Sequence, residues 1–324
     1  MNSVTTPYQK LESELARIGF VTHDQNLLAK IDKVTQVASS DISIVLTGAS
    51  GSGKNLLAYY IHTKSRRNRA KFITLDSGCL SPNLIESELF GHEKGAFTGA
   101  LNAHTGALER AQGGTLFLDE IGELSVHLQK KLLRAIETKS ITHLGGEKEI
   151  QLDFRLISAT NKNLKKMVKA KKFRKDLFFR LHESSLHLPP LRERRGDISL
   201  LARHFISLYN KEFNKKVMSV STIAMTYLEN YSWPGNVREL KNVIKSAVAS
   251  VNRDTLWVED LPLHFDHEKQ PVKWHGSIVP LEQMKKQYVS YVLNQYKWNK
   301  SKTAQALKIS RPRLDRIILR HGLE

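Results

Sequence analysis

The sequence predicts an α/β fold in which a parallel sheet is covered by helices, followed by a helical segment and a small all-α domain. Between Ile18 and Leu188, short apolar runs alternate with longer helical patterns. The runs read as buried strands and lie at residues 42–48, 71–76, 114–120 and 154–161. Such alternation is typical of a parallel sheet. After Leu188 apolar residues recur at spacings of three and four, which predicts helices.

The charge of the chain indicates a polyanionic partner. There are 50 Lys and Arg against 32 Asp and Glu, which gives a formal net charge of +18. Clustered basic side chains gain free energy by releasing counterions from nucleic acid. The charge therefore favours a nucleic-acid partner over a basic surface that is merely solvated.

No segment indicates membrane insertion or secretion, and we expect a cytoplasmic protein. No run of about 18 apolar residues is present, and the N-terminal residues lack the apolar core of a signal peptide. The single cysteine, Cys79, excludes an intramolecular disulfide, and we expect it to be buried and inert. His182 and His187 lie five apart, which misses the spacing of a zinc protease, so no histidine metal cluster is predicted.

A phosphate-binding loop, "GASGSGKNLL", follows the first predicted strand and begins a helical pattern. Its glycines let backbone N–H groups turn toward phosphate oxygens, and Lys54 reaches the terminal phosphates. Asn55 stands where Ser or Thr usually contacts Mg²⁺, but its carbonyl oxygen can still meet the metal's hydration shell. The expected nucleotide contacts are Gly48, Ala49, Ser50, Gly51, Ser52, Gly53, Lys54, Asn55 and Leu56.

Two acids end the third predicted strand, in "GGTLFLDEIGEL". There, Asp119 can hold Mg²⁺ or its waters, while Glu120 orients and polarises an attacking water. The alternative is an acidic strand end that caps the following helix. The neighbouring phosphate loop favours the catalytic interpretation. Two basic residues, Arg174 and Arg180, follow the strand ending at 161 and by themselves indicate only a solvated surface.

Together these motifs resemble the central AAA+ ATPase domain of the bacterial enhancer-binding proteins, which activate sigma-54 RNA polymerase. The resemblance runs from about Ile18 to the end of the chain. Its most specific part is "GAFTGA", the loop with which that family engages sigma-54; a small-residue surface hairpin is the alternative. The residues that the resemblance assigns to the sigma-54 contact are Gly95, Ala96, Phe97, Thr98, Gly99 and Ala100.

The same resemblance implies further roles. Thr160 and Asn161 would form the sensor of the γ-phosphate, and Arg238 the second sensor, on the helical lid. Arg174 and Arg180 would be arginine fingers that reach a neighbouring subunit's site. Fingers supplied in trans require a ring, so the resemblance implies a homo-oligomer, typically a hexamer, with ATP and Mg²⁺ at subunit boundaries.

In the ATPase domain, two positions depart from the family pattern. Many relatives carry an acid where this chain has Asn55, so that position does not mark a dead site. Asp76 stands where relatives usually have an Asn that hydrogen-bonds the catalytic glutamate. An ionised Asp only accepts hydrogen bonds and repels Glu120. We therefore expect Asp76 to be protonated or turned away, or the coupling of hydrolysis to loop movement to be altered.

The C-terminal segment predicts a DNA reader. Residues 281–324 hold ten Lys and Arg against three Asp and Glu. An apolar stripe predicts one helix, and its members are Leu281, Met284, Tyr288 and Val292. Two short helices separated by a tight turn follow, with Ser310 as a cap and Pro312 in the first turn of the last helix.

This arrangement resembles the Fis-type helix-turn-helix at the C-terminus of the same family. The resemblance places the last helix in the major groove of double-stranded DNA, with Arg311, Arg313 and Arg316 facing bases or phosphates. Leu314 and Ile318 should face the small core instead.

The expected organisation is a short extension at 1–17, an AAA+ α/β subdomain at 18–188, a helical lid at 189–261, a linker at 262–280 and the helix-turn-helix at 281–324. The extension is too short for a receiver domain. Control would then lie in expression level, in a separate regulatory protein or in ring assembly.

The expected function is that of an ATP-dependent transcriptional activator. The chain would bind enhancer DNA, assemble a ring and use ATP hydrolysis to remodel the closed promoter complex of sigma-54 RNA polymerase holoenzyme. Two alternatives stay open. One is a DNA-binding regulator whose AAA+ module is a hydrolysis-deficient, nucleotide-sensing platform, and the other is a helicase-like motor acting on DNA itself.

Overall fold

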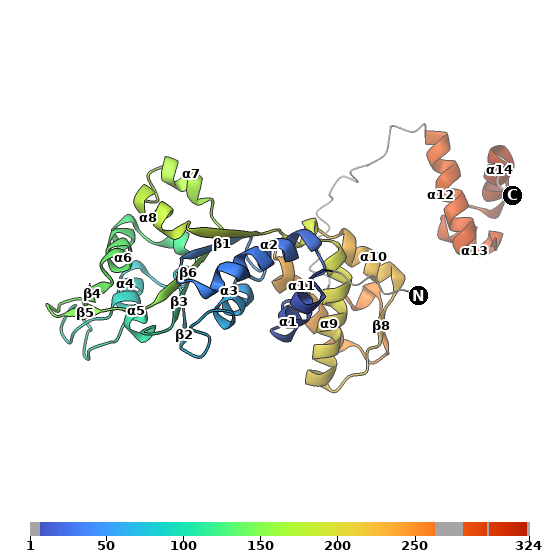
Figure 1. The fold of residues 1–324 in the computed structure, drawn as a ribbon. Coiled ribbons are helices and arrows are strands. Elements are labelled where there is room, and N and C mark those ends of the chain that lie inside the picture. Colours follow the sequence, from blue (N-terminus) through green and yellow to red (C-terminus); the bar gives the residue numbers. More distant parts are fainter. Residues whose placement is uncertain (1–6, 263–280, 297, 323–324) are drawn as a thin grey trace. The chain divides into compact units, whose positions relative to one another are not determined.

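The computed structural model describes residues 7–262, 281–296 and 298–322 (Figure 1). The chain divides into two compact units, Met1–Leu263 and His264–Glu324. Apart from Pro262, the predicted linker lies outside the described residues. Along the described residues, no helix combines the length and apolarity needed to span a bilayer.

A parallel sheet of five strands forms the centre of the first unit, in the order β2, β3, β6, β1, β7. The strands are β1 (Ile44–Gly48), β2 (Phe72–Asp76), β3 (Thr115–Asp119), β6 (Arg155–Thr160) and β7 (Ser184–Leu188). The first four confirm the predicted runs. The edge strand β7 was missed because only Leu186 and Leu188 within it are buried. The register sets Asp76 beside Asp119, so two acids meet at the carboxyl edge.

Helices cover both faces of this sheet. One face packs against α1 (Gln9–Arg17), α2 (Gln25–Gln36) and α3 (Lys54–Thr63), and the other against α4 (Pro82–Phe90), α5 (Ala107–Arg110), α6 (Val126–Thr138) and α8 (Lys175–Leu181). Successive residues of β1 alternate between the two cores: Ile44 and Leu46 face α2 and α3, while Val45 faces the other helices. This alternation follows from the two-residue period of a strand. Helix α7 (Leu164–Lys169) and the antiparallel hairpin of β4 (Ser140–Thr142) and β5 (Glu149–Gln151) complete the subdomain.

Three helices follow the sheet subdomain, as the spacing of apolar residues predicts. They are α9 (Gly196–Phe213), α10 (Thr222–Asn230) and α11 (Asn236–Ser250), and the two-residue strands β8 (Ser219–Val220) and β9 (Thr255–Leu256) pair beside them. Trp233 is fully buried here, and its indole N–H donates to the Leu228 carbonyl over 2.8 Å. A satisfied indole in a closed core fixes the entry to α11.

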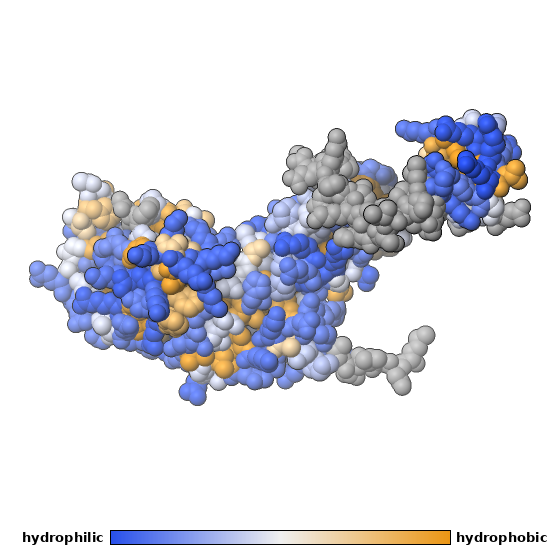
Figure 2. Space-filling view, turned by 90° about the horizontal axis from the view of Figure 1, so that it is seen from above, coloured by the Kyte–Doolittle hydropathy of each residue, from blue (hydrophilic) through white to orange (hydrophobic). Residues whose placement is uncertain are grey.

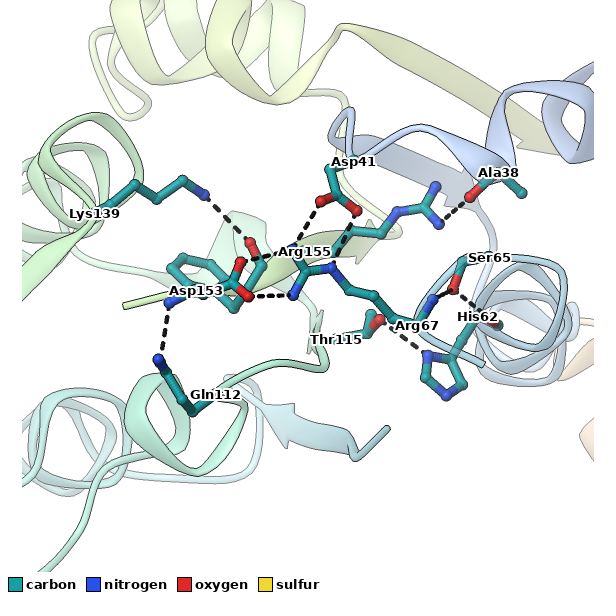
Figure 3. A network of polar contacts seen from close by, with 11 residues as sticks. Ala38, Asp41, His62, Ser65, Arg67, Gln112, Thr115, Lys139, Asp153 and Arg155 are labelled. Carbon is teal, nitrogen blue, oxygen red and sulfur yellow. Dashed lines mark hydrogen bonds and ion pairs between the residues drawn. The ribbon is translucent and has the colours of Figure 1, made fainter. Parts of the chain in front are cut away.

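A polar network lies at the amino end of β6, away from the carboxyl edge of the sheet (Figure 3). Arg67 donates to both Asp41 and Asp153, with shortest distances of 2.7 and 2.6 Å. The fully buried Arg155 donates to the Ala38 carbonyl over 2.6 Å. The planar guanidinium suits such paired carboxylates. The network therefore joins the loop before β1, the loop after α3 and the loop before β6.

The second unit contains α12 (Leu281–Gln295), α13 (Lys300–Ala306) and α14 (Arg311–His321). Its buried core consists of Val289, Leu293, Ala304, Leu314 and Ile318, so the expected inward positions of Leu314 and Ile318 are confirmed. The predicted stripe was wrong at Tyr288, which is 61% exposed, whereas Val292 is buried. The side chains of Leu281 and Met284 lie outside the described residues. Pro312 stands in the first turn of α14, but the Ser310 side chain forms no cap hydrogen bond.

Candidate active site

The phosphate loop connects β1 to α3 and depends on glycine backbone geometry. Gly51 and Gly53 hold φ angles of +75° and +109°, which L side chains rarely adopt. A Cβ on Gly51 would lie 2.4 Å from the Gly235 carbonyl oxygen, so the loop touches the lid backbone directly. The Ser52 hydroxyl is buried and has no hydrogen-bond partner among the described residues. A buried unpaired donor of this kind suits an anionic ligand oxygen.

Donors from the lid side satisfy three successive carbonyls of this loop. The Asn236 amide donates to the Ser50 carbonyl over 2.9 Å, and the Val237 N–H donates to that of Gly51 over 3.0 Å. The buried Arg194 guanidinium donates to the carbonyl of Ser52 over 2.9 Å. The Ser52 N–H donates to the Ala49 carbonyl over 3.3 Å within the loop. Donors from the lid side thus hold the loop carbonyls at residues 50 to 52, which fixes the loop backbone that a phosphate would contact.

Asn236 is the first residue of α11 and does not cap this helix. The N-cap of α11 is Gly235, and no side chain caps this helix. Asn236 is 1% exposed, holds φ +53° and accepts from the Leu191 N–H over 2.9 Å with the oxygen of the same amide. Its side chain therefore joins the lid to the phosphate loop.

Three predicted catalytic residues meet at the carboxyl edge of the sheet. Lys54 is 5% exposed, and its Nζ lies 3.1 Å from the Gly48 carbonyl and 3.5 Å from Glu120 Oε1. Glu120 Oε2 accepts from the Asn161 N–H over 3.0 Å. Glu120 itself holds φ +51°, an unfavourable geometry for a glutamate that aims its side chain toward the loop.

Asp119 is 8% exposed at the end of β3. Burial is the main cause that raises its pKa; the Glu120 N–H, 2.9 Å from Asp119 Oδ1, and the Lys54 charge oppose it without reversing it. A buried carboxylate with a raised pKa gains from a nearby cation. Within residues 7–262, 281–296 and 298–322, no cluster of three or more His, Cys, Asp or Glu is arranged to hold a metal by itself. The donor set fits Mg²⁺ carried by a nucleotide, which needs few protein ligands, and Asn55 is exposed in the first turn of α3 nearby.

Asp76 is turned toward its own loop. Its two carboxylate oxygens accept from the Gly78 N–H over 2.8 Å and from the Cys79 thiol over 3.1 Å. Cys79 is exposed, so its predicted burial was wrong, and the hydrogen bond to Asp76 is the main cause that raises the pKa of the thiol. Burial failed as a prediction because β2 is the edge strand, so the loop after it meets solvent.

The remaining sensor and finger candidates occupy distinct positions. Thr160 is fully buried, and its hydroxyl accepts from the Lys162 N–H over 3.0 Å. Arg238 donates to the Ser50 hydroxyl over 3.0 Å, so it reaches the phosphate loop from the lid. Arg174 and Arg180 pair with acids of their own region: Arg174 contacts Asp176, and Arg180 contacts Glu183 over 3.1 Å.

The "GAFTGA" segment forms a closed hairpin that follows α4. The Gly95 N–H donates to the Ala100 carbonyl over 2.9 Å, and the Ala100 N–H donates to that of Phe97 over 3.0 Å. Gly95 and Gly99 hold φ angles of +83° and +102°. Phe97 is 44% exposed, with its ring edge-on to His92. Thr98 is exposed and Ala100 is buried, so the hairpin presents its middle and anchors its end.

Arg311, Arg313 and Arg316 are all exposed on α14. The Arg316 Nε donates to the Pro312 carbonyl over 3.4 Å, within the helix. Hydrophilic residues dominate the visible surface of the C-terminal unit (Figure 2). Lys308, in the turn before α14, holds φ +52°, a conformation that glycine adopts more easily.

Sequence reasoning missed Arg194, Asn236 as a linking residue and His143. Arg194 is 3% exposed between the phosphate loop and Asp197, which in turn accepts from Thr22 over 2.6 Å. Arg194 lies in the turn before α9, Asn236 is the first residue of α11, and His143 lies in the loop after β4. No periodic pattern marks such positions, and the partner lies up to 186 residues away for Asn236.

The fold and this site define a P-loop protein of the AAA+ class with a helical lid. The family model for the sigma-54 interaction domain matches residues 20–187, and the model for the AAA+ ATPase lid domain matches residues 192–277. The chain therefore belongs to the family of sigma-54-dependent regulators, an ATPase family.

Similar proteins agree with this assignment. The chain is 42% identical to the regulatory protein AtoC of Escherichia coli (strain K12) over 300 residues, which cover 89% of this chain and 64% of AtoC. It is 43% identical to the sigma54-dependent transcriptional activator SfnR of Pseudomonas putida over 257 residues, 79% of this chain and 70% of SfnR. Crystal structures of NtrX from Brucella abortus with ADP and with ATP match at TM-scores of 0.71 and 0.70, with 29% and 30% identity, and cover 97% of this chain and 72% and 73% of NtrX.

Proposed function

We propose that this protein hydrolyses ATP in a homo-oligomeric ring, most simply a hexamer, and uses the energy to remodel the closed promoter complex of sigma-54 RNA polymerase. In this proposal the protein is held at enhancer DNA by its C-terminal unit. The observation that carries the proposal is the meeting of Lys54, Glu120 and Asn161 beside a glycine loop, in the subdomain that also bears the "GAFTGA" hairpin.

Nucleotide binding would begin with an exchange at Lys54. Its ammonium now contacts the Gly48 carbonyl and lies 3.5 Å from Glu120. Phosphate oxygens carry more negative charge than a backbone carbonyl or a single carboxylate, so the Lys54 ammonium would bind them instead. Glu120 would then lose its contact with Lys54. The Ser52 hydroxyl and Arg238 add donors on either side of the loop. When bound, Mg²⁺ would neutralise charge on the phosphates, held by Asp119 with Asn55 nearby.

Glu120 would orient and polarise the attacking water. Its Oε2 is held by the Asn161 N–H, so any shift at the sensor strand β6 moves the carboxylate directly. The side chain of Asp76 is engaged by Gly78 and Cys79, and among the described residues it shares no hydrogen bond with Glu120. Once Lys54 has moved to the phosphates, the position of the Glu120 carboxylate would depend on Asn161 rather than on Asp76.

Arg174 and Arg180 would act on the nucleotide of a neighbouring subunit. Each guanidinium is one-third or more exposed and is restrained by a carboxylate of its own region. Surface ion pairs of this kind are weak, so a phosphate can displace the carboxylate. Positive charge beside the γ-phosphate stabilises the transition state for its transfer.

The hairpin would make the contact with sigma-54 through exposed Phe97 and Thr98. Glycines at both of its ends hold left-handed angles and meet no atoms within 4 Å of an added Cβ, which permits hinging. Arg311, Arg313 and Arg316 would contact DNA from α14, some through bases and some through phosphates.

The deciding experiment is steady-state ATP hydrolysis as a function of protein concentration. We expect the rate per subunit to rise with concentration and to vanish in Glu120→Gln, while Glu137→Gln, an exposed change on α6, leaves it unaltered. Rising rates report an active site completed by a neighbouring subunit. Hydrolysis that is no higher than in Glu120→Gln, from folded protein that still binds DNA, would favour the nucleotide-sensing platform instead.

A second test addresses Asp76. In Asp76→Asn, the amide can donate to Glu120, which the carboxylate cannot. We expect a changed hydrolysis rate or a changed yield of sigma-54 open complexes per ATP hydrolysed. Cys79→Ser separates loss of the thiol contact from this effect. Hydrolysis and coupling that match the parent protein would remove any role for Asp76.

A further inference from the structure

The His143 ring lies between two carboxylates. Its Nδ1 is 2.8 Å from Glu93 Oε1, and its Nε2 is 2.9 Å from Glu109 Oε2. A neutral imidazole has a single N–H donor, and an ionised carboxylate only accepts. Both bonds therefore require one more proton than the neutral ring holds. Imidazole is more basic than a carboxylate, so the proton belongs on His143, as an imidazolium.

The three residues come from three segments around the "GAFTGA" hairpin. Glu93 stands two residues before Gly95, at the root of the hairpin. Glu109 lies in α5, whose Ala107 and Leu108 are fully buried in the core. His143 follows β4 and is followed by Leu144, whose carbonyl accepts from the Glu93 N–H over 3.0 Å. The ring thus ties the root of the hairpin to an element that cannot move alone.

The hairpin also rests on the segment that carries His143. A Cβ on Gly145 would lie 2.9 Å from the Ala96 side chain, so the first turn of the hairpin packs against the backbone next to His143. Movement of the hairpin and movement of His143 are consequently linked by contact. Backbone bonds already join His92 to His104 and the Leu144 N–H to the Gly91 carbonyl. The two ring bonds add the side-chain link from these segments to Glu109 of α5.

Other titratable and charged groups surround the ring without binding it. His92 is paired with the Ser87 hydroxyl and the Asn102 carbonyl. His104 lies 3.4 Å from Glu88 without hydrogen-bond geometry. The charged residues that share the groove beside His143 are Lys131 and Arg134 from α6 and Glu147 and Glu149 from the hairpin of β4 and β5. Of the described residues, Glu93 and Glu109 alone form ion pairs with His143.

We propose that His143 is a positioning residue whose imidazolium clamps the root of the sigma-54 hairpin to α5, and that loss of the ring proton releases the hairpin. The consequence for sigma-54 rests on the proposed function, whereas the clamp itself does not. After deprotonation the neutral ring has a single N–H, so it donates to one carboxylate, while the other faces the lone pair of the unprotonated nitrogen.

The direction of the pH dependence follows from the contacts. Burial by itself lowers the pKa of His143, but the bonds to Glu93 and Glu109 outweigh it and hold the pKa above its ordinary value of 6.5. A pKa raised by folding means that the clamp is intact at and below pH 6.5. The clamp is then lost as the pH rises through the folded value.

The first experiment reads the clamp without sigma-54. In the full chain, NMR of labelled histidine rings would follow His143, assigned by its absence from His143→Gln. We expect both ring nitrogens to be protonated at pH 6 and the titration midpoint to lie above 6.5. Glu93→Gln and Glu109→Gln should each lower that midpoint. A midpoint at or below 6.5, or a single-nitrogen proton at pH 6, would overturn the proposal.

The second experiment reads the hairpin. Hydrogen exchange of residues 92–101 is compared at each pH between the parent chain and His143→Arg, which keeps a charge and paired donors at every pH. We expect exchange in the parent to exceed that in the Arg variant by about tenfold at pH 8.5, the size of one hydrogen bond to a charged group. At pH 6 the two should agree. His143→Gln should exchange fast throughout, and His127→Gln, at an exposed position of α6, should match the parent.

Binding of sigma-54 measured on the same variants separates the two proposals. If exchange depends on pH as expected but sigma-54 never binds, the clamp stands and the proposed function fails. If sigma-54 binds but exchange in the parent and in His143→Arg is equal at every pH, the clamp is refuted and the proposed function survives.

Discussion

Asn236 offers a quantitative test of how the lid holds the phosphate loop. Asn236→Ala removes the acceptor of the Leu191 N–H and the donor to the Ser50 carbonyl, both over 2.9 Å. Leaving the buried N–H unpaired costs about 1.5 kcal/mol, and the exposed Ser50 costs less, about 0.5 kcal/mol. Alanine at φ +53° adds about 1 kcal/mol of backbone strain, which Asn tolerates better. The expected loss of unfolding free energy is about 3 kcal/mol.

Asn236→Gly divides this sum. Glycine adopts the left-handed backbone without strain but lacks both amide groups. We expect it to lose about 2 kcal/mol. The matched control is Asn230→Ala, because the Asn230 amide donates to a carbonyl over 2.9 Å at an exposed helix end, where the loss should stay below about 0.5 kcal/mol.

Urea unfolding of the full chain, followed by tryptophan fluorescence, measures these differences. Trp233 is fully buried three residues before Asn236 and reports the opening of the lid. If Asn236→Ala loses no more unfolding free energy than Asn230→Ala, water replaces both hydrogen bonds of Asn236 at no cost. If Asn236→Gly loses as much unfolding free energy as Asn236→Ala, the left-handed backbone at this position costs alanine nothing.

Two further predictions concern other parts of the chain. Lys308→Gly should stabilise the C-terminal unit by about 1 kcal/mol, because it removes the strain of a lysine in the left-handed conformation. Its thermal midpoint, followed by circular dichroism, should rise, whereas Lys302→Gly, inside α13, should lower the midpoint. Equal effects of the two variants would contradict the assignment of strain to Lys308. Hydrogen bonds from Arg67 hold the pKa values of Asp41 and Asp153 below their ordinary range. The two ionised carboxylates therefore stabilise the fold at a pH above their ordinary pKa, and this contribution is lost as the pH falls through their pKa values in the folded protein. Since both carboxylates are exposed, Arg67→Gln should cost at most about 1 kcal/mol at pH 7 and should flatten the stability curve between about pH 5 and 3; an unchanged acid profile would argue against the pairing.

The sequence alone determined four of the five strands of the central sheet, the phosphate loop and the acids at the strand ends. These features are local: a two-residue period defines a strand, and glycine spacing defines the loop. Because parallel strands end at one edge, the order of motifs also placed Lys54, Glu120 and Asn161 together, and the structure brings them within hydrogen-bond or ion-pair contact.

The tertiary structure alone decided which side chains serve as links. Asn236 turned out to hold the loop rather than cap a helix, and Cys79 is exposed because β2 is an edge strand. His143 lies between carboxylates 34 and 50 residues away in the chain. Such pairings depend on how helices and loops pack in space. The spacing of residues along the chain does not indicate which distant segments come into contact after folding.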